Sequence, residues 1–329
     1  MSAAASAHRP GDERAALVTG GAGFIGSHLV DRLLRDGWHV RVLDDFSSGR
    51  EANLAAAGEA VEVVRGDVCD APLLERCARG VDVVFHQAAV ASVPRSVAEP
   101  LRTHAVNATA TLLVLEAARR ARVRRVVFAA SSAAYGNDPA LPKVETMPPS
   151  PLSPYALQKW VGESYCGLYA ALYGVETVAL RYFNVFGPRQ DPESEYAAVI
   201  PRFVTACLAG EAPIVYGDGE QTRDFTYVAD AVEANVLAAD APEAAGTVVN
   251  VAGGRRVSLN EILALVAELT AARVRPRYEA ARPGDVRDSV ADLGRALAVL
   301  GFEPAVDLRE GLRRTIESFR SAAAGRARP

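Results

Sequence analysis

Short apolar runs alternate with longer helical patterns through the first half of the chain. The runs cover residues 16–20, 39–45, 61–67, 81–89, 124–132 and 177–184, and helix-like segments separate most of them. This order is typical of a parallel sheet, because the connection between parallel strands is usually a helix. The runs are rich in Val and Phe and lack strict alternation, which indicates strands that helices cover on both faces. The sequence therefore predicts an α/β fold with a doubly wound parallel sheet.

The second half is less regular and predicts a smaller α/β lobe. Residues 197–210 and 257–270 have helical patterns, the second with Ser258 and Glu261 at the positions of a capping box, and residues 214–219 and 223–228 resemble short strands. We expect residues 15–182 to form the sheet domain, with later segments crossing back to it, and residues 183–320 to form mainly the smaller lobe. Residues 1–14 are expected to be a disordered arm and residues 321–329 a frayed tail.

Composition excludes several classes of protein. The 329 residues carry a formal net charge of -4 with both signs spread along the chain, so there is no basic footprint for nucleic acid. The four cysteines form no C-x-x-C pair, which favours a reduced cytoplasmic protein without a metal site. The sequence contains no secretory signal and no apolar stretch near the roughly 18 residues that a membrane span requires. A small-molecule partner is expected.

A glycine-rich turn follows the first apolar run. Gly20, Gly23 and Gly26 lie between that run and an amphipathic helical pattern. Glycines allow a tight turn and close backbone approach, so that the N–H groups at the start of the helix can hold a pyrophosphate. A glycine triplet alone is weak evidence, but the strand, the helix and an acid at the end of the next run agree with it. Together they predict a dinucleotide site.

Acids at strand ends refine this prediction. Asp44 would accept hydrogen bonds from ribose hydroxyls, and with Asp45 would repel a 2′-phosphate, which favours NAD over NADP. Both aspartates are also compatible with turn caps, and nearby Arg50 leaves NADP open. Asp67 with Val68 would meet the adenine, although Asp67 equally suits the N-cap of the following helix. The small residues after the fourth run would lie close to the cofactor: Gln87, Ala88 and Ala89.

Tyr155 and Lys159 are four residues apart and so lie on one face of a predicted helix. Tyrosine has a pKa of about 10, and a base near neutral pH requires that pKa to fall by about 2 to 3 units. The positive charges of a lysine ammonium and of an oxidised nicotinamide would supply that shift. Ser131 and Ser132 follow the fifth run at the edge where such sheets bind ligands, and would hold the substrate oxygen; a turn or cap is their alternative role.

Taken together, these motifs resemble the extended short-chain dehydrogenase/reductase family across nearly all of residues 15–320. The segments AVASVPRSVAEP, SSAAYG, LPKVE, PLSPYALQKW and RYFNVFGPRQDPESEYAAVIPRF are most similar to UDP-hexose 4-epimerases, particularly UDP-N-acetylglucosamine 4-epimerases. The resemblance implies a Rossmann domain that binds NAD, a second lobe that binds a UDP-sugar, and a homodimer formed through helices 111–121 and 157–174. It adds cofactor contacts at Phe24, Ile25, Asn107 and Tyr182, and also at Tyr155 and Lys159. The expected substrate contacts are Ser92, Arg95, Asn184, Gln190, Val199, Tyr216, Arg223, Arg282, Asp285 and Ser289.

The segment after Ser132 separates the reactions of this family. Dehydratases and decarboxylases resemble this chain but carry an acid there, whereas this chain has Ala133 and Ala134. Alanine cannot protonate a leaving group, so the sequence favours oxidation at C4 to a 4-keto sugar followed by reduction on its other face. We therefore expect an isomerase, an NAD-dependent UDP-sugar 4-epimerase.

Ser289 is the expected determinant of substrate size. By resemblance, enzymes restricted to the non-acetylated hexose have a bulky tyrosine there, so serine favours UDP-GlcNAc/UDP-GalNAc, with UDP-Glc/UDP-Gal as a second pair. One alternative is a UDP-glucuronate 4-epimerase, with Arg95 and Arg189 available for the carboxylate. An alternative of another class is a non-catalytic NAD-binding regulator. Arg223 and Arg282 also suit surface salt bridges, and Asn184 also suits a turn.

Overall fold

A seven-stranded parallel sheet forms the centre of the computed structural model, which describes residues 14–192, 198–281 and 286–326. The strands lie in the order β11-β6-β5-β4-β1-β2-β3. Their bounds are β1 Ala15–Thr19, β2 His39–Asp44, β3 Val61–Arg65, β4 Val83–His86, β5 Arg125–Ser131, β6 Glu176–Tyr182 and β11 Thr247–Val251. The predicted doubly wound parallel sheet is confirmed.

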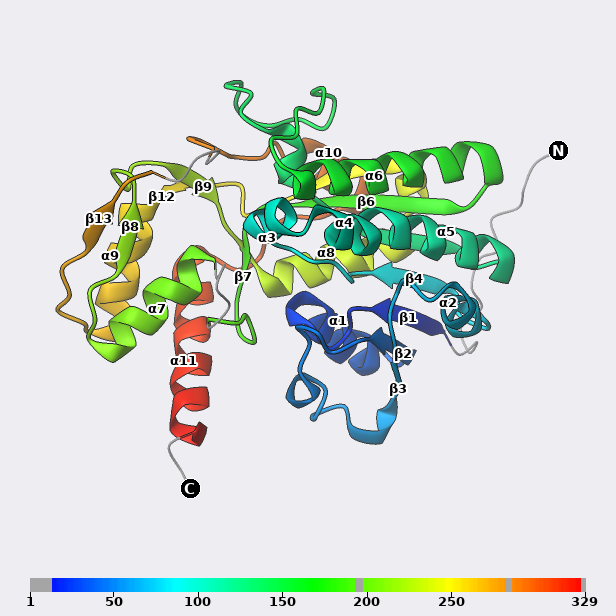
Figure 1. Cartoon of the computed structure of the whole chain (residues 1–329), viewed down its shortest axis with the longest axis horizontal. Helices are drawn as coiled ribbons and strands as arrows, with labels where there is room; N and C mark the ends of the chain where they lie inside the picture. Colours follow the sequence, from blue (N-terminus) through cyan, green and yellow to red (C-terminus); the bar gives the residue numbers. More distant parts are fainter. Residues whose placement is uncertain (1–13, 193–197, 282–285, 327–329) are drawn as a thin grey trace.

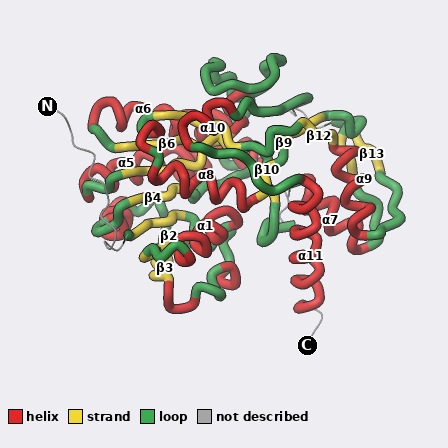
Figure 2. Tube along the Cα trace, turned by 180° about the vertical axis from the view of Figure 1, so that it is seen from behind, coloured by secondary structure: helices red, strands yellow, loops and turns green. Residues whose placement is uncertain are grey.

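Helices cover both faces of this sheet (Figures 1 and 2). One layer consists of α1 (Phe24–Arg35), α8 (Val228–Asp240) and α10 (Gly294–Leu300), and the other of α2 (Ala71–Ala78), α5 (Ala110–Ala121) and α6 (Pro154–Tyr173). In β5, Val127 and Ala129 pack on the first layer, and Val126 and Phe128 on the second. Both sets are buried, which explains why the apolar runs lack a polar face.

The smaller lobe lies beside the sheet (Figure 1) and has its own apolar core. Its helices are α7 (Val199–Ala209), α9 (Leu259–Thr270) and α11 (Leu308–Arg326), and Ser258 with Glu261 forms the predicted capping box of α9. Within the described residues, three two-stranded sheets complete it. They pair β7 (Val185–Phe186) with β10 (Thr226–Tyr227), β8 (Ile214–Tyr216) with β13 (Arg277–Glu279), and β9 (Thr222–Asp224) with β12 (Arg256–Ser258).

The chain returns from the smaller lobe to the sheet through α8 and β11. Strand β11 pairs in parallel with β6, from Thr247 opposite Val178 to Val251 opposite Tyr182. Residue 182 therefore ends only the first passage of the chain through the sheet, because β11 adds a later strand to it.

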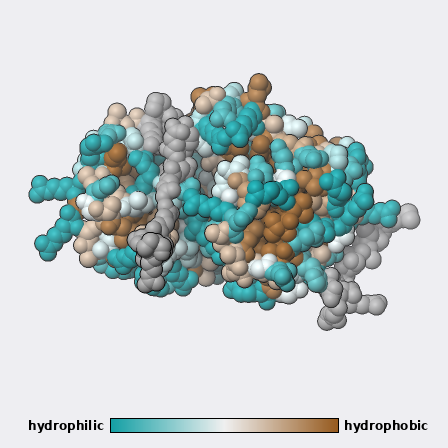
Figure 3. All heavy atoms as spheres, turned by 60° about the horizontal axis from the view of Figure 1, so that its bottom comes forward, coloured by the Kyte–Doolittle hydropathy of each residue, from teal (hydrophilic) through white to brown (hydrophobic). Residues whose placement is uncertain are grey.

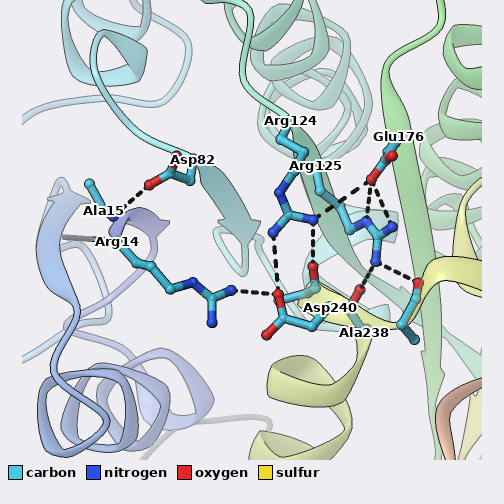
Figure 4. Close-up of polar contacts among 10 residues, drawn as sticks. Arg14, Ala15, Asp82, Arg124, Arg125, Glu176, Ala238 and Asp240 are labelled. Atoms are coloured by element: carbon cyan, nitrogen blue, oxygen red, sulfur yellow. Dashed lines mark hydrogen bonds and ion pairs between the residues drawn. The ribbon is translucent and has the colours of Figure 1, made fainter. Parts of the chain in front are cut away.

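The strands begin at an edge that ion pairs and backbone contacts hold together (Figure 4). Arg125 is buried, and its guanidinium lies 2.7 Å from Glu176 and donates to the Ala238 carbonyl at 2.8 Å. Arg14 lies 2.5 Å from Asp240. These contacts join α8 to the beginnings of the strands, at the edge opposite the predicted ligand site.

The surface is mixed in character. Figure 3, which brings the bottom of Figure 1 forward, shows hydrophobic residues gathered in one area of the larger lobe among mostly hydrophilic ones. Within the ranges that the structure describes, no helix has the length and apolar character needed to cross a membrane.

Candidate active site

The glycine-rich turn connects β1 to α1 at the edge of the sheet where the strands end. Gly20 has a φ of +70°, and a Cβ there would lie 2.7 Å from the Ala88 nitrogen. A Cβ on Gly26 would lie 2.1 Å from the Gly20 carbonyl oxygen. The first turn of α1 has no capping side chain and no acid. The backbone therefore leaves the helix N-terminus accessible to an anion, and this arrangement fits a dinucleotide pyrophosphate.

Asp44, at the end of β2, is buried beside this turn. Its carboxylate accepts hydrogen bonds from the backbone N–H groups of Ala22 at 2.9 Å and Phe46 at 2.8 Å. Burial raises the pKa of Asp44, and these two hydrogen bonds oppose that rise. Asp44 therefore caps this turn, as the alternative prediction had it. In that position its carboxylate also lies against the glycine loop, where a ribose would lie. Phe24 and Ile25, which begin α1, contact the core of the smaller lobe.

The residues around the predicted ribose have partners of their own. Asp45 is exposed and accepts a hydrogen bond from the Ser47 backbone at 2.9 Å. The Arg50 guanidinium lies 2.9 Å from the Asp191 carboxylate. Because Arg50 pairs with an acid, its position gives no support to a 2′-phosphate site.

Asp67 does not cap the helix that follows it, so that alternative reading is wrong. The N-cap of α2 is Asp70, which accepts a hydrogen bond from the Leu73 backbone at 3.0 Å. Asp67 is exposed and accepts from the Cys69 backbone at 2.8 Å, and Val68 is buried. The Asp67 carboxylate thus remains at the surface near the end of β3.

Gln87, just after β4, belongs to a polar cluster. Its side-chain amide donates to the Asn235 carbonyl oxygen at 3.0 Å and to the Tyr182 hydroxyl at 3.3 Å. Asn235 in turn donates to Tyr182 at 2.6 Å. The following residues, Ala88 and Ala89, are half-buried. Asn235, which the sequence analysis did not identify, fixes two of the predicted cofactor residues.

Asn107 holds the segment that follows the alanines. It lies in a π-helical turn, Ala105–Thr109, accepts from the Val90 N–H at 2.8 Å and donates to the Gln158 side chain at 2.9 Å on α6. This buried amide therefore ties the loop after β4 to the helix that carries Tyr155 and Lys159.

Tyr155 and Lys159 lie on α6 beside the end of β5, as predicted from their spacing. Lys159 is buried, and its Nζ donates to the Ala129 carbonyl at 2.8 Å. Burial lowers the pKa of Lys159 to about 8. Burial raises the pKa of the Tyr155 hydroxyl, and a hydrogen bond with Ser131 lowers it. Ser131, Tyr155 and Lys159 therefore form one group at the carboxyl edge of the sheet.

Ser132 begins a short 3₁₀ turn, Ser132–Tyr135, directly after β5. Ser131 caps this turn by accepting a hydrogen bond from the Ala133 N–H at 3.2 Å, so its predicted cap role is present too. The turn presents the Ala133 methyl group, half-buried, beside the two serines and buries Ala134.

A cavity of about 420 Å³ opens between the two lobes. Its wall joins the segment after β4 to β7, α7, β8 and β9, and includes the apolar side chains of Phe186 and Phe203. Arg202 also lines it, with its guanidinium 5.2 Å from the centre of the Tyr216 ring. Five of the predicted substrate residues line this cavity: Ser92, Asn184, Val199, Tyr216 and Arg223.

Other predicted residues lie beside the cavity or outside the described ranges. The Ser289 N–H donates to the Thr222 carbonyl at 3.2 Å, so Ser289 lies next to β9 and Arg223. Gln190 donates its side-chain amide to the Val185 carbonyl at 3.2 Å. Arg282 and Asp285 lie outside the described residues.

Asn184 has a φ of +28°, so its backbone forms a turn between β6 and β7. Its side-chain amide donates to the Asp224 carbonyl at 3.1 Å while the residue lines the cavity. Asn184 therefore shapes the turn and also forms part of the cavity wall.

Arg95 and Arg189 both pair with acids. Arg95, in α3 (Val93–Ala98), lies 3.5 Å from Glu99, and Arg189 lies 2.7 Å from Asp31 on α1. Ser92 caps α3 by accepting from the Arg95 N–H at 3.2 Å.

Comparison with known proteins agrees with this geometry. Residues 16–252 match the model of the NAD dependent epimerase/dehydratase family. The chain is 45% identical over 309 residues to a UDP-glucose 4-epimerase of Mycolicibacterium smegmatis, covering 93% of this chain and 98% of that protein.

Two solved structures show the same fold. One is a UDP-N-acetylglucosamine 4-epimerase from Methanobrevibacter ruminantium in complex with UDP-N-acetylmuramic acid, with a TM-score of 0.91 and 43% identity over 94% of this chain and 99% of that one. The other is a UDP-glucose 4-epimerase from Thermotoga maritima with UDP-glucose, with a TM-score of 0.90 and 40% identity over the same shares of the two chains.

Proposed function

Because the chain belongs to the NAD dependent epimerase/dehydratase family and is a UDP-sugar 4-epimerase, we propose that it interconverts UDP-GlcNAc and UDP-GalNAc. The pair UDP-Glc/UDP-Gal is its second substrate pair. The observation that carries the choice of sugar is the small Ser289 beside Arg223 and β9. The cofactor is NAD, which the glycine turn and Asp44 would hold.

Each member of the edge group has a distinct role in this proposal. NAD, held by the glycine turn and Asp44, would supply the hydride chemistry at C4 of the sugar. Tyr155 accepts the proton of the 4-hydroxyl and later gives it back. The Lys159 ammonium stabilises the Tyr155 phenolate, because an opposite charge nearby favours the ionised form. Ser131 and Ser132 hold the substrate oxygen that exchanges the proton.

The alanines beside these serines support epimerisation over elimination. Loss of water or carbon dioxide requires an acid or a carboxylate-orienting group near the reacting carbon. The 3₁₀ turn offers the methyl groups of Ala133 and Ala134 instead. The keto sugar would therefore remain intact until it is reduced.

The cavity between the lobes suits the nucleotide end of the substrate. Arg223 at the cavity wall offers forked donors for the diphosphate, and Tyr216 and Val199 provide an apolar wall for the uracil. Asn184 and Ser92, also in the wall, would contact the diphosphate and the hexose. Gln190, beside the cavity, would complete the hexose contacts.

A preference for UDP-glucuronate has less support. A carboxylate at C6 needs a cation, and the two arginines available from the sequence, Arg95 and Arg189, already pair with Glu99 and Asp31. The alternative of a non-catalytic NAD-binding regulator is set aside, because the similar proteins named above are UDP-sugar 4-epimerases.

The test of this proposal is direct. The purified protein is incubated separately with UDP-GlcNAc, UDP-Glc and UDP-GlcA without added NAD, and the 4-epimers are followed by NMR. We expect turnover of the first two sugars with cofactor that copurifies. Turnover of UDP-GlcA alone would overturn the proposed substrate, and strict dependence on added NAD would overturn tight retention.

We also propose a cytoplasmic homodimer. The outer surface of α6 and of neighbouring α4 (Pro100–His104) exposes large apolar side chains, with Leu101 87% and Leu172 68% exposed. Burying such a surface in a helix bundle would stabilise a dimer. A monomer by light scattering would refute the dimer.

The cytoplasmic location is supported by the cysteines. They are free thiols, which suits a reducing compartment: Cys69, Cys77, Cys166 and Cys207.

A further inference from the structure

A buried ion pair lies behind the catalytic face of α6. Glu163 on α6 accepts two hydrogen bonds from the Arg181 guanidinium on β6, at 2.8 and 2.6 Å. The Arg181 and Glu163 side chains are only 4% and 7% exposed. Nothing in the proposed reaction uses either group, yet burying two charges requires a compensating benefit.

Glu163 follows Lys159 by one helical turn. Residues four apart on a helix have neighbouring side chains, so the carboxylate is within reach of the lysine if it is not held elsewhere. In the structure the two point to different partners: Lys159 donates to the Ala129 carbonyl of β5, and Glu163 binds Arg181 of β6. Across the described residues, Lys159 forms no ion pair with a carboxylate.

We propose that Arg181 is a positioning residue that neutralises Glu163 and thereby keeps the full charge of Lys159 available to Tyr155. This inference rests on the proposed roles of Tyr155 and Lys159. An unpaired carboxylate one turn from Lys159 would cancel part of the positive potential at the Tyr155 hydroxyl. The tyrosine would then ionise only at higher pH.

The titratable groups nearest to Lys159 are neutral, so the Arg181–Glu163 pair is the main source of charge near that lysine. His86 on β4 is buried, and burial followed by the Lys159 charge lowers its pKa to about 3, so it is neutral during catalysis. The Cys166 thiol of α6 is neutral too, because burial raises its pKa. The remaining charged or titratable residues on the elements packed against α6 are Arg95 of α3, Arg102 and His104 of α4, Glu116, Arg119 and Arg120 of α5, Arg125 of β5, Glu176 and Tyr182 of β6, and Tyr135 of the 3₁₀ turn.

Those neighbours do not substitute for Arg181. Arg95 and Arg102 pair with Glu99, and Glu116 binds Arg119 and Tyr169 at the far end of α6. Tyr135 lies beneath the guanidinium, with the Arg181 Cζ 4.6 Å from its ring centre, and donates to Asn250 at 2.7 Å. Arg181 is therefore the cation that neutralises Glu163.

Charge-altering variants test the sign of this effect. Arg181→Met leaves an unpaired carboxylate, and we expect the acid limb of the kcat–pH profile to move up by about one unit, with kcat about tenfold lower below that limb. Glu163→Gln leaves an unpaired cation, and we expect the limb to move down. The double variant Arg181→Met/Glu163→Gln removes both charges and should keep the wild-type limb.

A readout independent of turnover accompanies the profiles. Tyr155 ionisation is followed in each NAD-containing protein by ultraviolet difference spectroscopy against the same protein with Tyr155→Phe, and thermal unfolding reports whether each variant is folded. A purely structural pair would give single variants whose limbs do not move in opposite directions, which would overturn the proposal. If neither single variant folds, the double variant becomes the test. A shift of the acid limb of its kcat–pH profile away from the wild-type position would overturn the proposal.

Failure of the proposed function would look different. If Tyr155→Phe alone retains full epimerisation, then Tyr155 is not the base and the proposed mechanism fails, whatever the effect of Arg181. If Tyr155→Phe is inactive but the Arg181 and Glu163 variants keep the wild-type pH profile, only the inference about this ion pair fails.

Discussion

The Lys159 ammonium donates a hydrogen bond to the Ala129 carbonyl at a distance of 2.8 Å. A carbonyl oxygen orients the lysine without neutralising it, so its positive charge persists inside the protein. Because Ala129 belongs to β5, the strand that ends in Ser131, one strand fixes both the lysine and the hydroxyl that contacts Tyr155. In the proposed mechanism, the sheet thus sets the geometry of the proton transfer.

Tyr155→Phe should retain bound NAD and lose about a hundredfold or more of kcat, because it removes the proton-transfer group and keeps the ring. The measurement is epimer formation by NMR, together with the NAD content of the purified protein. Tyr173→Phe, at the exposed end of the same helix, is the matched control and should behave as wild type. Full activity of Tyr155→Phe would exclude the assigned role.

Ser289→Tyr should reduce UDP-GlcNAc turnover by about tenfold or more and leave UDP-Gal turnover close to wild type. The reason is steric, since overfilling a packed site costs about 1 to 3 kcal/mol and only the N-acetyl sugar needs the space. Initial rates with each sugar give the comparison. Ser289→Ala, which also leaves room, should accept both sugars, and equal losses for both sugars in Ser289→Tyr would show that Ser289 does not read substrate size.

Asp191→Asn should raise the affinity for NADP relative to NAD by about two- to fivefold, the range expected for loss of an exposed ion pair. The substitution removes the carboxylate that lies 2.9 Å from Arg50 and makes that guanidinium available to a 2′-phosphate. Titration of cofactor-depleted protein with each dinucleotide measures the ratio. The double variant with Arg50→Ala should show no gain; a gain without Arg50 would contradict this explanation.

His86 should make the fold less stable as the pH falls. Burial lowers its pKa from 6.5 to about 3, so between these values the unfolded chain binds a proton that the folded chain does not. The free energy of unfolding should then fall by up to about 1.4 kcal/mol per pH unit below 6.5, and should recover above it.

Denaturant unfolding at pH 7 and pH 5 tests this linkage. His86→Asn should lose the pH-dependent part while the effects of buried acids such as Asp224, whose pKa burial raises to about 6, cancel in the comparison. His104→Asn, on the exposed side of α4, is the control that should change nothing. If the pH dependence of His86→Asn equals that of the wild type, the effect belongs to another group.

The sheet was predictable because its strands are buried on both faces and therefore show continuous apolar runs. The capping box of Ser258 and Glu261 was predictable because its signal lies within four residues. Asp67 and Asp70 compete for the same cap, and Pro72 resolves the choice, because it lies in the first turn of α2, two residues after Asp70.

The remaining features depend on long-range contacts that no local pattern reports. Residues 247–251 follow an irregular segment, and their place beside β6 is set by the path of α8 across the sheet. Arg181 pairs with Glu163, and Asn235 bonds to Tyr182, from elements that the sequence separates. Arg202 faces the cavity through the orientation of α7, which helical periodicity alone leaves undetermined.

Strand β11 has a further consequence for how the chain is synthesised. Its partner β6 is complete at Tyr182, but β11 ends at Val251, after β7, α7, β8, β9 and β10 of the smaller lobe have been made. Until then the outer edge of β6 carries unpaired backbone groups, which favour pairing with other chains. A nascent or truncated chain that stops before Thr247 therefore exposes an aggregation-prone edge, and productive folding on the ribosome depends on how quickly that last strand arrives.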